Sequence, residues 1–268
     1  MERLCGNPLA KSKITSGTKE WADHNINCCL GCYNDCRYCY ARKMATRFGR
    51  TTQEDWRDMK VRKDQVNRSY RRMKGRVMFP TSHDIIDIPE VEEVCFKTLE
   101  NLLKSGNELL VTTKPRLTVI QNIHGRFSQD EERIQFRFTI TSCNDELLKF
   151  WEPNAPLFQE RMQSLIFGFE KGYKTSVSIE PFLDYNPEPL VKAVAPFSTE
   201  SIWIGKMNYI PRNGIGALEA PFYEDVRRNY EISHLMEIHA NLKNQPKVRF
   251  KDSILNKLNL LSERKSSK

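Results

Sequence analysis

The sequence predicts an α/β fold built around a parallel β-sheet. Six short segments have the apolar or alternating pattern of β-strands, and segments with helical periodicity lie between them. Strands that alternate with helices are typical of βαβ units, whose strands run parallel. With 268 residues, of which 39% are hydrophobic, the chain is long enough to bury a large core in one sizeable domain.

The predicted strands are short, and polar residues follow each of them. They cover residues 24–27, 76–80, 108–113, 134–141, 175–181 and 201–205. The fourth alternates strictly between apolar and polar side chains, as a half-buried strand does. Because reactive groups of parallel α/β barrels lie at the carboxyl ends of the strands, we expect these polar residues to share one site.

Apolar residues recur every three or four positions between the strands, and this spacing predicts helices. The clearest helix covers 89–105, with Pro89 at its start and Gly106 closing it. The other predicted helices run from 37 or 40 to 48, then over 51–74, 117–122, 145–170 with an interruption at 151–156, 189–195, 220–241 and 252–261. The segment 51–74 is strongly basic. A solvated face explains this charge, and a surface for a phosphate-rich substrate is the alternative.

We divide the chain into a flexible polar arm (1–20), the α/β domain (21–212) and a helical extension with a frayed basic tail (213–268). No apolar run approaches the ~20 residues that a bilayer span needs, and the first residues lack the apolar core of a signal peptide. We therefore expect a cytoplasmic protein with no membrane partner. The net charge of +8 is compatible with a nucleic-acid partner and equally with anionic small molecules.

Five of the eight cysteines fall within twelve residues, from Cys28 to Cys39. Cys32, Cys36 and Cys39 have the spacing C-x3-C-x2-C. Three thiolates on so short a loop can converge on one soft metal centre. A [4Fe–4S] cluster held by three cysteines has one iron without a protein ligand, so an outside molecule can bind there.

Zinc is the alternative metal for this loop, with Cys28, Cys29, Cys5 or His24 as a fourth ligand. Zinc ribbons and fingers usually supply two separated ligand pairs, whereas these cysteines share one short loop. A disulfide framework is disfavoured because the sequence shows no secretory signal. The favoured interpretation is therefore an iron–sulfur cluster.

The residues around Cys39 resemble a known family. Tyr38 precedes this cysteine and Tyr40-Ala41-Arg42 follows it, an arrangement that resembles the radical S-adenosylmethionine (radical SAM) enzymes. Cys-Tyr-Ala-Arg is similar to the lyase-like branch that contains spore photoproduct lyase. Glu20-Trp21 and the segment Met44-Ala45-x-Arg47-Phe48 are similar to phage-associated radical SAM proteins, whose first cysteine tends to lie further upstream. That placement would select Cys29 as a ligand, but we favour Cys32.

The resemblance implies a partial (β/α)6 TIM-type barrel with a [4Fe–4S] cluster and S-adenosyl-L-methionine (SAM) as cofactors. It implies that an electron, supplied by a reductant such as flavodoxin or ferredoxin, cleaves SAM to a 5′-deoxyadenosyl radical. This radical would abstract a hydrogen atom from a substrate that the sequence does not identify. A nucleic acid, through lesion repair or base modification, is one candidate, and a peptide or small metabolite is the alternative.

The resemblance also implies roles for residues at the strand ends. Lys114 would lie near the SAM carboxylate, which a fixed cation suits, and Thr81 and Ser82 would lie near its amine. Ser142 is the candidate for the ribose hydroxyls. The remaining candidates are Tyr38 and Tyr40 beside the cluster and adenine, Ser178 and Glu180 beside the adenosine or substrate, and Cys143 as a catalytic thiol that returns hydrogen.

Two interpretations without catalysis remain open at this point. A zinc-stabilised or iron–sulfur nucleic-acid-binding module would bind DNA or RNA in a salt-dependent way and would not cleave SAM. A protein whose iron–sulfur cluster only carries electrons would bind no SAM, and replacing Lys114 would not affect it.

Overall fold

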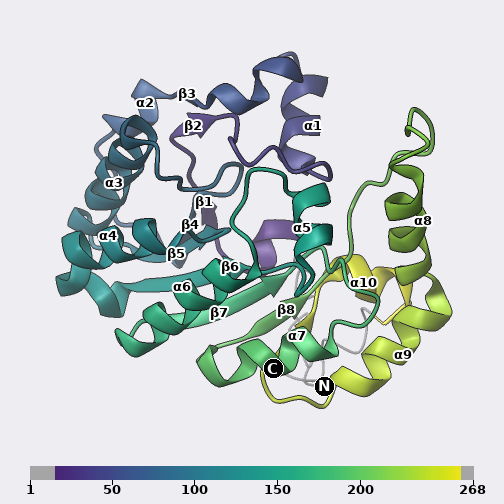
Figure 1. Ribbon diagram of the computed structural model, residues 1–268. Coiled ribbons are helices and arrows are strands. Elements are labelled where there is room, and N and C mark those ends of the chain that lie inside the picture. Colours follow the sequence, from purple (N-terminus) through teal and green to yellow (C-terminus); the bar gives the residue numbers. More distant parts are fainter. Residues whose placement is uncertain (1–15, 261–268) are drawn as a thin grey trace, which may run out of the picture.

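The computed structural model describes residues 16–260 (Figure 1). Residues 1–15, which include most of the expected arm and Cys5, and the expected frayed tail at 261–268 lie outside the described residues. The centre of the fold is a seven-stranded, wholly parallel sheet with the order β1-β4-β5-β6-β7-β8-β9. The prediction of an α/β fold with a parallel sheet is confirmed.

All six predicted strands are present in the sheet, and a seventh joins them. The bounds are β1 His24–Asn25, β4 Arg76–Phe79, β5 Glu108–Thr113, β6 Ile134–Thr139, β7 Lys174–Ile179, β8 Ile202–Ile204 and β9 Val248–Phe250. Strand β9 pairs with β8 and comes from the segment in which we expected only helices. Three residues are too few to show an alternating pattern, so no local pattern predicts this strand.

The middle of the sheet is buried on both faces. Every residue of β5 after Glu108 is buried, as are the first five of β6, because parallel sheets are normally covered on both sides. Helices α3 (Pro89–Lys104), α4 (Leu117–Phe127), α6 (Phe158–Glu170) and α7 (Glu188–Val194) cover the outer side (Figure 1). The predicted helix at 89–105 is confirmed, with Gly106 at a φ of +75° just beyond it.

The prediction of one long helix over 51–74 is wrong. This segment forms a short 3-10 helix η2 (Glu54–Asp58), strand β3 (Lys60–Val61), helix α2 (Lys63–Val66) and then a loop. Met59 has a φ of +49°, which ends the first helical turn. Trp56, Met59 and Val66 are buried, so their spacing reflected burial but not one continuous helix.

Strand β3 pairs antiparallel with β2 (Cys29–Leu30). Helix α1 (Tyr40–Arg47) follows the segment 28–39, which we call the cysteine loop. These elements lie together beyond one edge of the sheet (Figure 1). The remaining elements are η1 Gly17–Glu20, η3 Ser128–Arg133, α5 Asp145–Trp151, η4 Ala195–Phe197, α8 Ala220–Asn229, α9 Ile232–Leu242 and α10 Asp252–Lys257. The single helix expected at 220–241 is therefore two. Within residues 16–260, every helix is too short or too polar to cross a bilayer.

Candidate functional site

A cavity of about 600 Å³ lies at the carboxyl ends of the strands, between the sheet and the cysteine loop. Most of the predicted site residues line it, as the strand-end rule led us to expect. These are Cys32, Cys36, Tyr38, Cys39, Tyr40, Thr81, Ser82, Lys114, Ser178 and Glu180. The cavity also includes residues for which we predicted no role, among them Asp84, Arg137 and Lys251.

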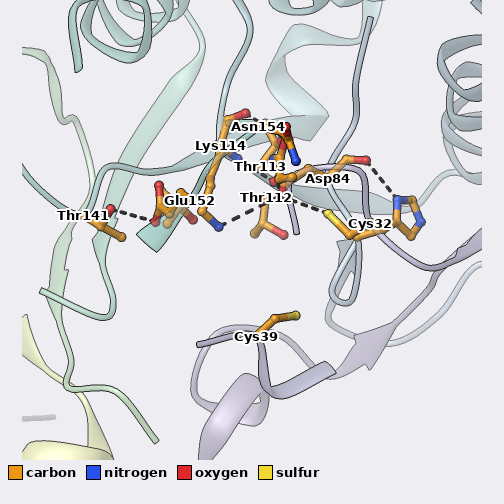
Figure 2. Close-up of polar contacts among 12 residues, drawn as sticks. Cys32, Cys39, Asp84, Thr112, Thr113, Lys114, Thr141, Glu152 and Asn154 are labelled. Atoms are coloured by element: carbon orange, nitrogen blue, oxygen red, sulfur yellow. Dashed lines mark hydrogen bonds and ion pairs between the residues drawn. The ribbon is translucent and has the colours of Figure 1, made fainter. Parts of the chain in front are cut away.

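The three cysteines of the C-x3-C-x2-C segment face this cavity together. Burial raises the pKa of Cys32 well above its ordinary value, and the negative charge of Asp84 raises it further. Burial also raises the pKa of Cys36 to about 12 and raises that of Cys39. Figure 2 shows Cys39 across an open space from Cys32 and Asp84. A soft cation would reverse these shifts, because it binds thiolates and displaces their protons.

Cys29, the alternative first ligand, does not line the cavity. It is buried in strand β2, with an exposed fraction of 1%. The structure thus brings Cys32 rather than Cys29 together with Cys36 and Cys39.

The backbone around Gly31 fixes where Cys32 lies. Gly31 has a φ of +105°, and a Cβ there would lie 2.4 Å from the carbonyl oxygen of Trp56, so only glycine fits. The N–H of Cys32 donates to that same carbonyl at 2.8 Å. At the other end of the loop, the N–H of Arg42 in the first turn of α1 donates to Cys39 Sγ at 3.4 Å. A helix N-terminus favours negative charge, so it stabilises a thiolate at this position.

Asp84 connects the cysteine loop to the sheet. Its carboxylate accepts hydrogen bonds from Asn34 Nδ2 at 2.8 Å, Thr113 Oγ1 at 3.0 Å and the N–H of Lys114 at 2.6 Å, and Cys32 Sγ lies 3.6 Å from Oδ2. Burial opposes ionisation, but the charge of Lys114 and these donors outweigh it and lower the pKa of Asp84. The sequence placed Asp84 at a strand end but gave no sign of its partners, which are distant along the chain.

Lys114 places a buried cation beside the cysteines. Its Nζ lies 4.0 Å from Asp84 Oδ2 (Figure 2). It also lies 5.7 Å from the ring centre of Tyr38. Burial would lower the pKa of Lys114, but the negative charges of Cys36, Asp84 and Glu152 raise it on balance. The ammonium group therefore stays charged although the side chain is almost fully buried.

Glu152 and Arg161 form a fully buried ion pair behind the cavity. Arg161 Nη2 lies 2.5 Å from Glu152 Oε2, and both side chains have an exposed fraction of 0%. Glu152 Oε1 also accepts from Thr141 Oγ1 at 2.8 Å and from the hydroxyl of Tyr38. The hydrogen bond from Tyr38 to Glu152 fixes the orientation of Tyr38. The sequence alone predicts no such role for Glu152 or Arg161.

Asn27 holds the loop that carries Thr81 and Ser82. Its Oδ1 accepts from the N–H groups of both residues at 2.8 Å, and its Nδ2 donates to Thr81 Oγ1 at 2.7 Å. Both hydroxyl side chains line the cavity. One amide side chain just before the cysteine loop thus positions the end of strand β4.

The opposite wall is formed by charged side chains of β6, β7 and the C-terminal segment. Burial raises the pKa of Glu180 to about 7, although Lys251 Nζ lies 3.9 Å away. Burial lowers the pKa of Arg137 to about 9, and its guanidinium lies 4.6 Å from the ring centre of Trp21. Lys251 also pairs with Glu20 and donates to the carbonyl oxygen of Gly17 at 2.8 Å. Residues from both ends of the described chain therefore close this side of the cavity.

Two predicted site residues do not line the cavity. Ser142 is buried, and its hydroxyl donates to Asp184 Oδ1 at 2.5 Å. The N–H of Cys143 donates to Asp184 Oδ2 at 3.1 Å, and its side chain is exposed. Strand β6 ends at Thr139, before these two residues, and both contact Asp184 outside the cavity.

Comparisons with known proteins give distant similarities. No family model matches the chain. An uncharacterized protein of Acidianus two-tailed virus is 23% identical over 252 residues, which cover 86% of this chain and 81% of that protein. An uncharacterized protein of Methanocaldococcus jannaschii is 26% identical over 195 residues, covering 70% of this chain and 72% of that protein.

Among solved structures, the chain is similar to spore photoproduct lyase. A mutant of that enzyme with bound AdoMet and dinucleoside spore photoproduct matches with a TM-score of 0.55 and 15% identity, over 89% of this chain and 79% of that one. A second mutant matches with a TM-score of 0.56 and 14% identity, over 90% and 79%. The chain therefore shares the fold of these structures.

Proposed function

We propose that this chain is a radical SAM enzyme. The observation that carries the proposal is the position of Cys32, Cys36 and Cys39. In a fold shared with spore photoproduct lyase, these three cysteines line the cavity at the strand ends, beside the buried charges of Lys114 and Asp84. Among residues 16–260 no fourth cysteine lines the cavity, and three sulfur donors suit a [4Fe–4S] cluster with one accessible iron. Bound there, the reduced cluster would supply the electron that cleaves SAM to a 5′-deoxyadenosyl radical.

The residues around the cysteines fit the polar groups of SAM. Lys114 offers a charged donor for the carboxylate. Asp84 is anionic and lies near enough to Lys114 to hold the amine on the same side, with Thr81 and Ser82 as additional partners. Tyr38, fixed by Glu152, and Tyr40 supply aromatic surface, and together they limit access of water. The protein thus binds and orients SAM, while the cofactor supplies the radical chemistry.

We further propose that the substrate is a nucleic acid that undergoes lesion repair or base modification. Arg137 lines the cavity, and among the described residues its Nη1 is buried without a hydrogen-bond partner. A phosphate group would satisfy this donor. The net charge of +8 and the dinucleoside bound to the similar lyase structure support the same substrate class.

Anaerobic reconstitution with iron and sulfide tests the radical chemistry. With dithionite and SAM, the wild-type protein should be brown and should release 5′-deoxyadenosine, whereas Cys32→Ala should do neither. Cys143→Ala is the matched control, because this thiol is exposed and does not line the cavity. A colourless protein that holds only zinc, or a reducible cluster that leaves SAM intact, would reject the enzyme proposal in favour of a binding module or an electron carrier.

Salt titrations test the substrate class. If nucleic acid is bound through phosphates, affinity for single- and double-stranded DNA and RNA should fall steeply as salt rises, and Arg137→Met should weaken binding. Transfer of deuterium between bound nucleic acid and 5′-deoxyadenosine would identify the position attacked. A protein that cleaves SAM but binds no nucleic acid at low salt would point to a peptide or small metabolite instead.

A further inference from the structure

A second group of metal-ligand side chains lies behind the cysteine loop. Cys28 and Cys29 come from the start of that loop, His83 from the turn after β4, and Cys95 from the middle of α3. All four are buried, with exposed fractions of 0%, 1%, 5% and 0%. None of the three cysteines lines the large cavity, whereas His83 does, and the proposed radical chemistry uses none of the four side chains.

The donor atoms converge at distances that suit one metal ion. Cys28 Sγ lies 4.0 Å from Cys29 Sγ, 3.6 Å from Cys95 Sγ and 3.8 Å from His83 Nε2. The ligand atoms of Cys28, Cys29 and His83 all lie within 4.8 Å of one another. In a tetrahedral zinc site with Zn–S of about 2.3 Å and Zn–N of about 2.0 Å, neighbouring donors lie about 3.5–3.8 Å apart. Cys95 Sγ lies outside the group of donors that are all within 4.8 Å of one another, so a movement of this side chain toward the other donors would complete such a site.

The imidazole of His83 is already in the form that binds metal. Its Nδ1 lies 3.1 Å from the carbonyl oxygen of Asp84, and a carbonyl only accepts, so Nδ1 must carry the hydrogen. The lone pair then resides on Nε2, which faces Cys28 Sγ and accepts the N–H of Cys29 at 3.3 Å. Histidine ligands of metals commonly donate their other N–H to a backbone carbonyl in this way.

We propose that Cys28, Cys29, Cys95 and His83 form a second metal centre, a structural site for zinc. Three sulfurs and one imidazole nitrogen are a common ligand set of structural zinc, and four protein donors leave no open position. The ion would join the base of the cysteine loop to α3 and to the turn that carries Asp84. Because Asp84 contacts Cys32 and Lys114, this centre would hold the cavity residues in place without touching substrate. The proposal does not depend on the radical SAM reaction.

Metal analysis of a variant without the cavity cysteines tests this proposal. The full-length triple variant Cys32→Ala, Cys36→Ala, Cys39→Ala, purified anaerobically, should still contain one zinc per chain. With Co²⁺ in place of zinc, it should show the visible bands of a tetrahedral thiolate site. Adding Cys95→Ser or His83→Ala should abolish stoichiometric zinc and those bands, whereas adding Cys143→Ser should change neither.

Three outcomes would overturn the proposal. The triple variant could bind neither zinc nor Co²⁺ while remaining folded by circular dichroism. Cys95→Ser could keep one zinc with an unchanged Co²⁺ spectrum, which would remove Cys95 from the ligand set. Mass spectrometry could find Cys28 and Cys95 joined in a disulfide in the anaerobic protein, since closure from 3.6 Å to the ~2.05 Å of an S–S bond would need only a small movement. If the added substitutions prevent folding, the Co²⁺ spectrum of the triple variant alone decides.

Discussion

The cysteine loop supplies two neighbouring groups of thiols whose surroundings differ. Cys32, Cys36 and Cys39 face a cavity and have the charges of Asp84 and Lys114 beside them. Cys28 and Cys29 instead lie beside Cys95 and His83, and all four of these side chains are buried. Catalytic metal sites keep an open position, whereas structural ones are closed by protein ligands. Gly31 separates the two groups along the chain, so one backbone turn assigns each cysteine to its environment.

The largest expected effect is a difference between the two cysteine groups: one should matter for 5′-deoxyadenosine formation and the other for the free energy of unfolding. Cys36→Ala should reduce 5′-deoxyadenosine formation to background and, in protein without the iron–sulfur cluster, change the free energy of unfolding little, because its side chain lines the cavity. Cys95→Ser should lower that free energy by more than about 4 kcal/mol, the range in which loss of a metal falls. Chemical denaturation and product analysis on both variants measure this difference.

Equal losses of stability in Cys36→Ala and Cys95→Ser would contradict the comparison. Cys143→Ala is the control for both measurements, because its side chain is exposed.

The next effect concerns the buried ion pair between Glu152 and Arg161, behind the cavity that Cys32, Cys36 and Cys39 line. Arg161→Met should destabilise the fold by about 3–5 kcal/mol, because it leaves the buried carboxylate of Glu152 without a cation. The matched control is Lys192→Met, since Lys192 pairs with Glu188 at 2.8 Å on the surface, where its side chain is 72% exposed. That substitution should change the free energy of unfolding by no more than about 1 kcal/mol. Equal effects in urea denaturation would show that burial does not decide the strength of these pairs.

A smaller effect is expected at Lys114, the residue that we propose binds the SAM carboxylate. Lys114→Met removes a charged hydrogen-bond donor, which is worth about 1.5–3 kcal/mol. The dissociation constant of SAM should therefore rise about 10- to 100-fold. Calorimetry on the reconstituted anaerobic protein measures it, with Lys192→Met as the control. An unchanged affinity would remove Lys114 from the proposed SAM site.

The strands and the cavity cysteines could be predicted from the sequence because their signals are local. Strict alternation identified β6, and the spacing of Cys32, Cys36 and Cys39 identified the cavity loop. Strand β9 is only three residues long, so its pairing with β8 determines it more than its own pattern does. The segment 51–74 shows that apolar residues at helical spacing also fit several short elements packed on one surface.

The missed site residues depend on partners that lie far apart in the sequence. Asn27 holds Thr81 from a distance of 54 residues, and Ser142 turns to Asp184 from 42 residues away. A strand-end rule places such residues near a site, but it cannot say which of them face the cavity. Tertiary hydrogen bonds decide that, and no local pattern in this chain records them.

The smallest effect concerns Glu180, on the wall opposite the cysteines. Its pKa of about 7 in the fold lies above the ordinary value of 4.5, so the folded chain keeps this proton longer than the unfolded chain does. The contribution of Glu180 to stability is therefore fully present below about pH 4.5, declines as the pH rises to about 7, and is constant above that. Glu180→Gln removes this dependence, so the variant should gain about 1–2 kcal/mol relative to wild type between pH 6 and pH 8, at about 1.4 kcal/mol per unit of pKa.

Glutamine is the suitable replacement because the site around Glu180 is tight: a Cβ on Gly205 would lie 2.7 Å from Glu180 Cγ. The comparison is made by urea denaturation without SAM at both pH values, and Glu188→Gln on the surface serves as the control. A difference between Glu180→Gln and wild type that stays constant with pH would show that Glu180 is ionised throughout. Lys251 would then outweigh the effect of burial, and this wall would present a fixed negative charge to the cavity.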